Sequence, residues 1–199
     1  MGHKAFTGSS GSGKTQRLKE LIRSEKDDFK IIFDSFGEYQ SDIQELIADG
    51  YMIAEESFLQ PSNTPFKEQL ERALNVNIEN NKVLHIVTND LDNGFEAASL
   101  KSFFHKIEQE MQEPGKKIRI YIDSNISVLN NLTQGVMAVG RSYDCVIRAA
   151  FQTHKEIDGF ILNNIETEVR SASGDFHKVL VYNKNEEPSF KEEYHGTYK

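Results

Sequence analysis

The chain has 199 residues, of which 38% are hydrophobic and 27% are charged, a composition typical of one globular domain with a sizeable core. Its formal net charge of −8 argues against a protein that coats nucleic acid through a broad basic face. No apolar run reaches the roughly 18 residues of a membrane span, and no signal segment precedes the first motif. A cytoplasmic protein without a membrane span is therefore expected. Its single cysteine, Cys145, excludes an internal disulfide and is expected to be a buried hydrophobe.

A short strand is expected at residues 4–7, and a glycine-rich segment follows it directly. That segment reads Gly8-Ser9-Ser10-Gly11-Ser12-Gly13-Lys14-Thr15, a complete G-x-x-x-x-G-K-[ST] phosphate-binding loop. The apolar residues behind it have helical spacing: Leu18, Leu21 and Ile22. This strand–loop–helix context disfavours the alternative of a flexible Gly/Ser tract.

Each residue type in the loop has a role in holding a nucleoside triphosphate. The glycines let backbone N–H groups surround phosphate oxygens, Lys14 reaches the β- and γ-phosphates, and the Thr15 hydroxyl can ligate Mg²⁺. The sequence therefore predicts ATP and Mg²⁺ as cofactors.

Beyond the loop, residues 29–34 predict an apolar strand that closes on Asp34, and residues 35–39 predict a turn. Further elements are expected in this order: a helix at 41–49, a strand at 51–56, a helix at 66–78, a strand at 83–88 and a helix at 100–111. His85, in the last of these strands, is expected to be a satisfied core or edge residue rather than a metal ligand.

Residues 118–123 predict another apolar strand, and it ends in Asp123. This is the shape of a Walker B element, in which the carboxylate holds Mg²⁺ through water. An Asp after an apolar strand is more often a turn residue or helix cap, but the phosphate loop upstream favours the magnesium role.

The remaining pattern completes an alternation of strands and helices. A helical segment is expected at 130–139, and strands are expected at 143–152 and 179–182. Alternating elements predict a mostly parallel sheet with helices on both faces, an α/β P-loop NTPase (RecA-like) fold. We expect this ATPase domain to span residues 1–182, and we expect residues 183–199 to form a loosely held polar tail.

The order of elements resembles the FtsK/HerA superfamily of P-loop motors, which includes DNA translocases, conjugation coupling proteins and viral genome-packaging ATPases. Four segments match. The first is the phosphate loop, and the second is Phe33-Asp34-Ser35-Phe36-Gly37-Glu38-Tyr39, which is similar to the family's Asp-Pro-x-Gly-Glu-Tyr motif. The third is the Walker B strand at Asp123, and the fourth is Gly140-Arg141-Ser142-Tyr143 before a strand that ends in Gln152. In size and layout the chain is most similar to small viral packaging ATPases, with Zot-like and coupling proteins more distant. Because the loop begins at Gly8, no N-terminal anchor is expected, and we expect a viral or plasmid origin.

The resemblance implies roles for two further residues. Gln152 would sense the γ-phosphate or the attacking water, and Arg141 would act as an arginine finger across a subunit boundary. The structural alternatives are a strand-end turn residue for Gln152 and a surface ion pair for Arg141. The family also implies a homo-oligomeric ring that moves double-stranded DNA, held weakly by the isolated subunit, with phage or mobile-element proteins as partners.

The sequence departs from the family at Ser124, where a Glu usually follows the Walker B Asp. A hydroxyl near neutral pH is a poor proton acceptor, and general-base assistance contributes on the order of 10²–10⁴-fold. The candidate replacements lie at or near the ends of other strands: Asp34, Glu38, Glu55, Glu56 and Asp90. Glu38 is the first choice, although each of these alone is more often a solvated acid or helix cap.

These observations leave three functions open. The first is an ATP-driven DNA motor that binds nucleotide through Lys14, Thr15 and Asp123. The second is a nucleotide-binding switch or adaptor with little hydrolysis, which the serine at position 124 motivates. The third, a small-molecule kinase, has the weakest support because the scattered arginines form no lid cluster over the phosphates.

Overall fold

The computed structural model describes residues 2–25, 28–48, 52–57, 82–87, 97–124, 126–153, 157–173, 176–182 and 189–194. Within them the strands form one nine-stranded sheet in the order β3-β4-β2-β5-β6-β1-β7-β8-β9. The strands are β1 (Lys4–Thr7), β2 (Phe29–Asp34), β3 (Met52–Ser57), β4 (Lys82–Val87), β5 (Ile118–Asp123), β6 (Cys145–Phe151), β7 (Glu166–Ser173), β8 (Phe176–Tyr182) and β9 (Ser189–Tyr194). Every pairing from β3 across to β7 is parallel, whereas β7–β8 and β8–β9 are antiparallel.

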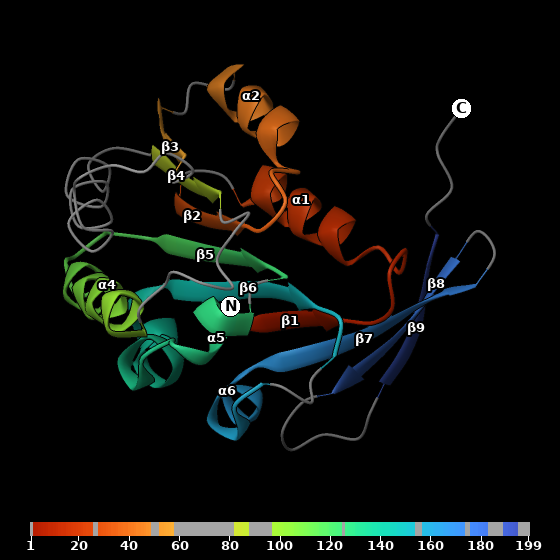
Figure 1. The fold of residues 1–199 in the computed structure, drawn as a ribbon. Helices are drawn as coiled ribbons and strands as arrows, with labels where there is room; N and C mark the ends of the chain where they lie inside the picture. The colour runs from red at the N-terminus through yellow and green to blue at the C-terminus, as the bar shows by residue number, and fades with distance from the viewer. Residues whose placement is uncertain are drawn as a thin grey trace.

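Helices cover both faces of the parallel part of the sheet (Figure 1). They are α1 (Lys14–Ser24), α2 (Gln40–Ala48), α4 (Ala97–Glu110), α5 (Ile126–Asn130) and α6 (Gly159–Asn164), together with a π-helical turn η2 (Gly135–Val139) and a 3₁₀ turn η3 (Gly140–Tyr143). None of the helices that the structure describes is long and apolar enough to cross a bilayer.

Two apolar cores, one on each face, hold the layers together. Leu18 and Ile22 of α1 pack with Phe6 and Ile32 of the sheet on one face. The larger core on the other face includes α4, whose ring pair Phe103 and Phe104 contacts Phe33. Strands β2, β5 and β6 are buried along their whole length, and they are mainly apolar apart from one buried basic residue inside each: Lys30, Arg119 and Arg148. The expected α/β P-loop NTPase (RecA-like) architecture is therefore confirmed.

Cys145 is fully buried at the start of β6, as expected. Burial raises the pKa of its thiol to about 12, so the thiolate that would make it reactive does not form near neutral pH.

Two parts of the chain differ from the expected elements. The helix expected at 130–139 is broken, because α5 ends at Asn130 and Thr133 Oγ1 accepts the Val136 N–H (3.5 Å) where the π-helical turn begins. Strand β7 was not expected, because two of its buried positions carry the charges of Glu168 and Arg170. The helix expected at 66–78 lies outside the described residues.

The tail expectation also needs correction at β9. Its six residues, assigned to a loosely held tail from residue 183 onward, pair with β8 instead. Backbone hydrogen bonds rather than an apolar pattern form this antiparallel ladder, so the polar composition of the segment hid it. The expected domain boundary at residue 182 thus falls between two paired strands.

Candidate functional site

The phosphate loop connects the carboxyl end of β1 to the first turn of α1. Gly13 adopts a left-handed conformation (φ 80°), after which Lys14 begins the helix. Gly8 has φ 144°, and a Cβ placed on it would lie 2.1 Å from the carbonyl oxygen of Arg170. The Ser12 N–H donates to the Ser9 carbonyl (3.2 Å), which closes the loop. The loop thus has the glycine-dependent shape that the motif requires.

Lys14 lies inside this loop rather than in solvent. Its side chain is buried, and Nζ donates to the Ser9 carbonyl (2.8 Å) and to Ser12 Oγ (3.5 Å). Burial lowers the pKa of Lys14, while the negative charge of Asp123 opposes that shift. A buried cation is thereby held where the motif places the nucleotide's phosphates. Thr15, the next residue, is half-buried in the first turn of α1.

Asp123 lies at the same carboxyl-terminal end of the strands as the phosphate loop, on β5, which β6 separates from β1. It ends β5 in register with Ala150 of β6, and Phe151 of β6 is in register with Thr7 of β1. Because these strands are parallel, their carboxyl ends meet beside the phosphate loop.

Both carboxylate oxygens of Asp123 accept hydrogen bonds from hydroxyl groups. Tyr39 donates to Oδ2 over 2.7 Å, and Ser124 donates to Oδ1 over 3.0 Å. Ser124 itself has a positive φ of 58°, and its N–H donates to the Ala150 carbonyl (2.8 Å). Its hydroxyl is therefore committed to Asp123.

Asp34 forms the base of the turn that follows β2. Oδ1 accepts the N–H groups of Phe36 and Glu38, and Oδ2 accepts the N–H of Tyr39. The buried His85 on β4 donates from Nε2 to Oδ2 over 2.9 Å, so it is a core residue, as expected. Its Nδ1 is also buried and has no hydrogen-bond partner among the described residues, so the expectation that the ring is fully satisfied is not met. Burial alone would raise the pKa of Asp34, but these hydrogen bonds hold it below its usual value.

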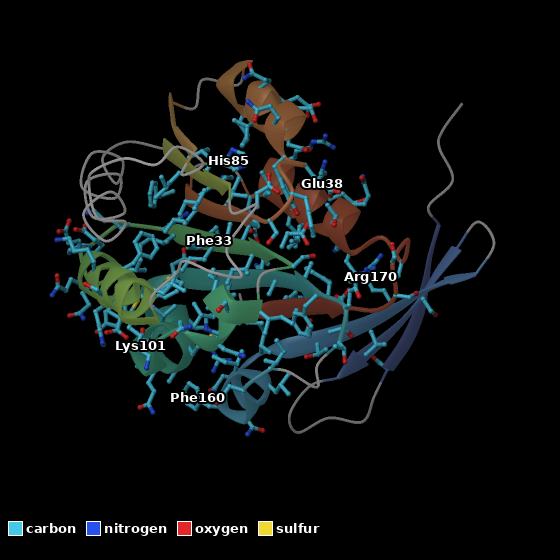
Figure 2. All side chains as sticks on the ribbon, viewed as in Figure 1. Phe33, Glu38, His85, Lys101, Phe160 and Arg170 are labelled. Atoms are coloured by element: carbon cyan, nitrogen blue, oxygen red, sulfur yellow. The ribbon has the colours of Figure 1, made fainter. Side chains whose placement is uncertain are left out.

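The other candidate residues fall at different places in the fold. Gln152 directly follows β6 and is exposed at the edge that carries the phosphate loop. Glu38 is exposed in the turn after β2, and its carbonyl accepts a hydrogen bond from Lys19 of α1 (2.6 Å); Figure 2 shows it beside that helix. Arg141, in the turn before β6, is exposed at the opposite end of the strands, where β6 begins. The structure therefore brings Gln152 and Glu38 to the phosphate-loop edge, but not Arg141 of the same chain.

Two of the other carboxylates considered as replacements for the missing glutamate lie farther from the phosphate loop in the strand order. Glu55 and Glu56 are on β3, an edge strand, and β4 separates that strand from β2. Asp90 lies outside the described residues.

Arg170 of β7 is a site residue that the sequence analysis missed. Its side chain is buried, Nε donates to the Ser12 carbonyl of the phosphate loop (3.4 Å), and NH1 pairs with Glu168 (3.3 Å). Figure 2 shows it between the loop and the β7–β9 end of the sheet. A charged pair two residues apart was the available signal, because a half-buried strand seldom carries charges on its inward face.

The donor atoms at this edge fit a magnesium–nucleotide complex. The Thr15 hydroxyl and the Asp123 carboxylate are oxygen donors of the kind that Mg²⁺ prefers. The part of the chain that the structure describes holds no group of three or more His, Cys, Asp or Glu side chains arranged for a metal. In nucleotide sites magnesium commonly takes phosphate oxygens and water together with one or two such protein ligands.

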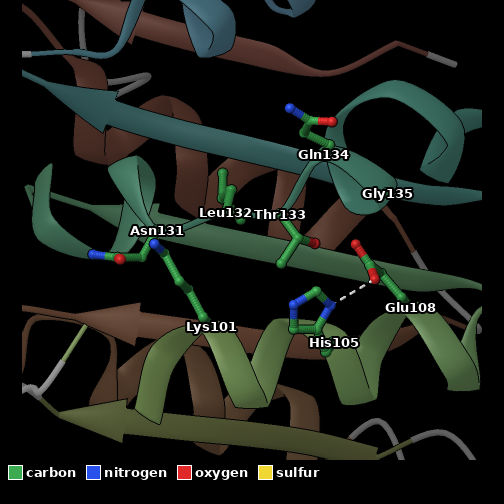
Figure 3. A pocket seen from close by; sticks show the side chains of 8 residues that line it. All are labelled: Lys101, His105, Glu108, Asn131, Leu132, Thr133, Gln134 and Gly135. Carbon is green, nitrogen blue, oxygen red and sulfur yellow. Dashed lines mark hydrogen bonds and ion pairs between the residues drawn. The ribbon is translucent and has the colours of Figure 1, made fainter. Parts of the chain in front are cut away.

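A separate hollow of about 490 Å³ lies between α4 and residues 131–135 (Figure 3). Its lining residues are Lys101, His105, Glu108, Asn131, Leu132, Thr133, Gln134 and Gly135. His105 and Glu108, three residues apart on α4, are paired with each other along one wall of the hollow (2.9 Å). Because α4 covers the face opposite α1, this hollow is distinct from the phosphate-loop site.

No family model matches the chain, and no curated protein matches its sequence. Among solved structures, it is similar to a chain in the structure of the Drosophila ORC bound to AT-rich DNA and Cdc6, with 16% sequence identity and a TM-score of 0.31. That alignment covers 80% of this chain and 57% of the other, so the chain spans a little over half the length of the protein it matches.

Proposed function

We propose that this chain binds ATP with Mg²⁺ and hydrolyses it as the subunit of a ring-shaped motor that moves or packages double-stranded DNA. The observation that supports it most strongly is the buried Lys14, which is held inside a complete phosphate loop. Burial lowers its pKa, and the negative charge of Asp123 only partly opposes that shift. A buried lysine is costly unless an anion compensates it, and a nucleotide's phosphates would supply that anion.

Phosphoryl transfer needs little covalent chemistry from the protein, so the site would act by positioning and by stabilising charge. Lys14 and the loop N–H groups would bind the phosphates, and the Thr15 hydroxyl and Asp123 carboxylate would hold the metal. Magnesium, when bound, neutralises charge on the phosphate oxygens. Gln152, at the same edge, would orient the attacking water.

The general base is the least conventional part of this site. Ser124 cannot accept the proton, and its hydroxyl is occupied by Asp123. Glu38 is the candidate we favour, because it is exposed in the turn that Asp34 fixes next to Asp123. The same turn contributes Tyr39 to Asp123, so Glu38 has a rigid support.

Assembly into a ring is supported by the position of Arg141. The residue is exposed at the end of the strands opposite the phosphate loop. It could therefore complete only the nucleotide site of a neighbouring copy. A head-to-tail contact of this kind closes into a ring when the rotation between subunits allows it. The DNA cargo and a viral or plasmid origin rest on the resemblance to FtsK/HerA motors.

A nucleotide-gated adaptor with little hydrolysis is the second candidate. Ser124 favours it, because a serine there replaces the usual base and its hydroxyl is bound to Asp123 rather than free to act on a water. Such a protein would bind ATP as tightly as the motor but would not turn it over.

Calorimetric titration with ATP and Mg²⁺ tests the nucleotide site shared by both candidates. We expect saturable binding that Lys14→Ala weakens at least tenfold, because the buried cation is lost. Lys101→Ala, which removes an exposed lysine on α4, is the matched control and should bind as the wild type does. Absence of ATP binding by the wild-type protein would refute both candidates.

A further inference from the structure

We propose that Tyr39 is a positioning residue that fixes the orientation of the Asp123 carboxylate for magnesium, held in place by Asp34 and His85. This inference rests on the proposed function, since it takes Asp123 as the carboxylate that serves the metal. The observation behind it is an unbroken path of buried hydrogen bonds from β4 to the end of β5.

Tyr39 is held at its backbone N–H, at its hydroxyl and over its ring. The residue is fully buried, and its hydroxyl donates to Asp123 Oδ2 over 2.7 Å. Its N–H donates to Asp34 Oδ2 over 3.2 Å, and the Lys19 ammonium lies 5.2 Å from the ring centre. A phenol with so little freedom holds its acceptor in one direction.

The anchor of this arrangement is Asp34, whose carboxylate accepts three N–H groups of one turn and the Nε2 hydrogen of His85. His85 is itself fully buried on β4, which pairs with β2. The turn therefore cannot move Tyr39 away from Asp123 without breaking buried hydrogen bonds to a charged group, which are among the stronger ones in proteins.

The chemistry of Asp123 leaves room for the metal beside these two hydroxyl donors. Each carboxylate oxygen offers two lone pairs, so Oδ1 and Oδ2 can each accept one hydroxyl and still face a metal-bound water. Burial, followed by the charge of Asp123, raises the pKa of Tyr39 far above its usual value. Tyr39 therefore stays protonated and acts as a donor, never as a base. Partners that orient a metal ligand in this way commonly change metal affinity by about 10–100-fold.

The test is Tyr39→Phe, which keeps the ring and removes the hydroxyl. We expect the magnesium concentration at half-saturation, measured by titrating the ATP-bound protein with MgCl₂, to rise about tenfold. ATP affinity in EDTA should stay within about twofold of wild type, because the phosphate loop is untouched. Tyr143→Phe, at an exposed tyrosine, is the matched control and should leave both quantities unchanged.

His85→Gln supplies an independent variant in case Tyr39→Phe does not fold. It should weaken magnesium binding in the same direction but less, because the turn retains its three N–H bonds to Asp34. A wild-type magnesium midpoint in a folded Tyr39→Phe, or an equal loss of ATP affinity in EDTA, would overturn the inference. Failure of the wild-type protein to bind ATP would instead refute the proposed function, so the two failures are distinguishable.

Discussion

Arg170 closes off the space beside Gly8: its carbonyl oxygen lies 2.1 Å from the position that a Cβ at residue 8 would occupy. Its guanidinium reaches the carbonyl of Ser12 in the same loop (3.4 Å). Strand β7 therefore supports the phosphate loop with both its backbone and a buried side chain.

The first prediction concerns Gly8→Ala. The added methyl group must displace the backbone of β7, and the alanine must keep a backbone φ of 144°. We therefore expect a loss of stability of about 2–4 kcal/mol and loss of ATP binding. Gly11→Ala is the matched control, because Gly11 has a positive φ of 77° but no atom within 4 Å of its Cβ position. It should cost only about 1–2 kcal/mol. Urea unfolding of both variants measures the difference, and equal stabilities would contradict the role of β7.

His3 supplies a prediction about pH. It is buried directly before β1, where Nε2 donates to the Met137 carbonyl (2.9 Å) and Nδ1 accepts the Ile147 N–H (3.1 Å). Burial lowers its pKa from 6.5 to about 4. Between these values the unfolded state binds a proton that the folded state excludes, so stability falls as the pH falls through this window.

The loss from His3 should approach about 3 kcal/mol near pH 4. His3→Gln, which keeps a donor and an acceptor but does not titrate, should show a flatter decline between pH 6.5 and 4. Urea unfolding at several pH values compares the two proteins. Parallel pH profiles for the wild type and the variant would show that His3 is not the titrating group.

The sequence predicted the parts of the site that depend on local chemistry or on strand ends. The loop could be predicted because glycines and a lysine at fixed spacing define it, and Asp123 could be placed because parallel strands end at one edge. The bond from Tyr39 to Asp123 joins residues 84 positions apart and depends on β2 lying next to β5, which no periodicity reveals. Arg170 was missed because two buried positions of its strand, Glu168 and Arg170, carry charges instead of apolar side chains.

Glu38→Gln tests the general base. If Glu38 accepts the proton from water, the substitution should lower kcat by on the order of 10²–10⁴-fold while ATP affinity stays the same. Glu45→Gln, at an exposed glutamate of α2, is the matched control and should retain wild-type turnover. A drop of less than about threefold in Glu38→Gln would exclude Glu38 as the base, because base assistance is typically worth far more.

Mixing two inactive variants tests whether Arg141 acts across a subunit boundary. Arg141→Ala keeps an intact phosphate loop, and Lys14→Ala keeps an intact Arg141. If Arg141 completes the site of a neighbour, mixing the two proteins should restore part of the hydrolysis that each lacks alone. The control replaces Lys14→Ala with the double variant Lys14→Ala/Arg141→Ala, which should restore nothing. Equal hydrolysis in both mixtures would show that Arg141 does not act in trans.

The central claim is that this chain turns over ATP as part of an assembly that engages DNA. Its most direct test is the rate of ATP hydrolysis per subunit across a protein concentration series, with and without double-stranded DNA, beside Lys14→Ala as background. The motor account predicts turnover that rises with protein concentration or with DNA and is lost in Lys14→Ala. Tight ATP binding with hydrolysis that stays at the Lys14→Ala level throughout would contradict it and would leave the nucleotide-gated adaptor.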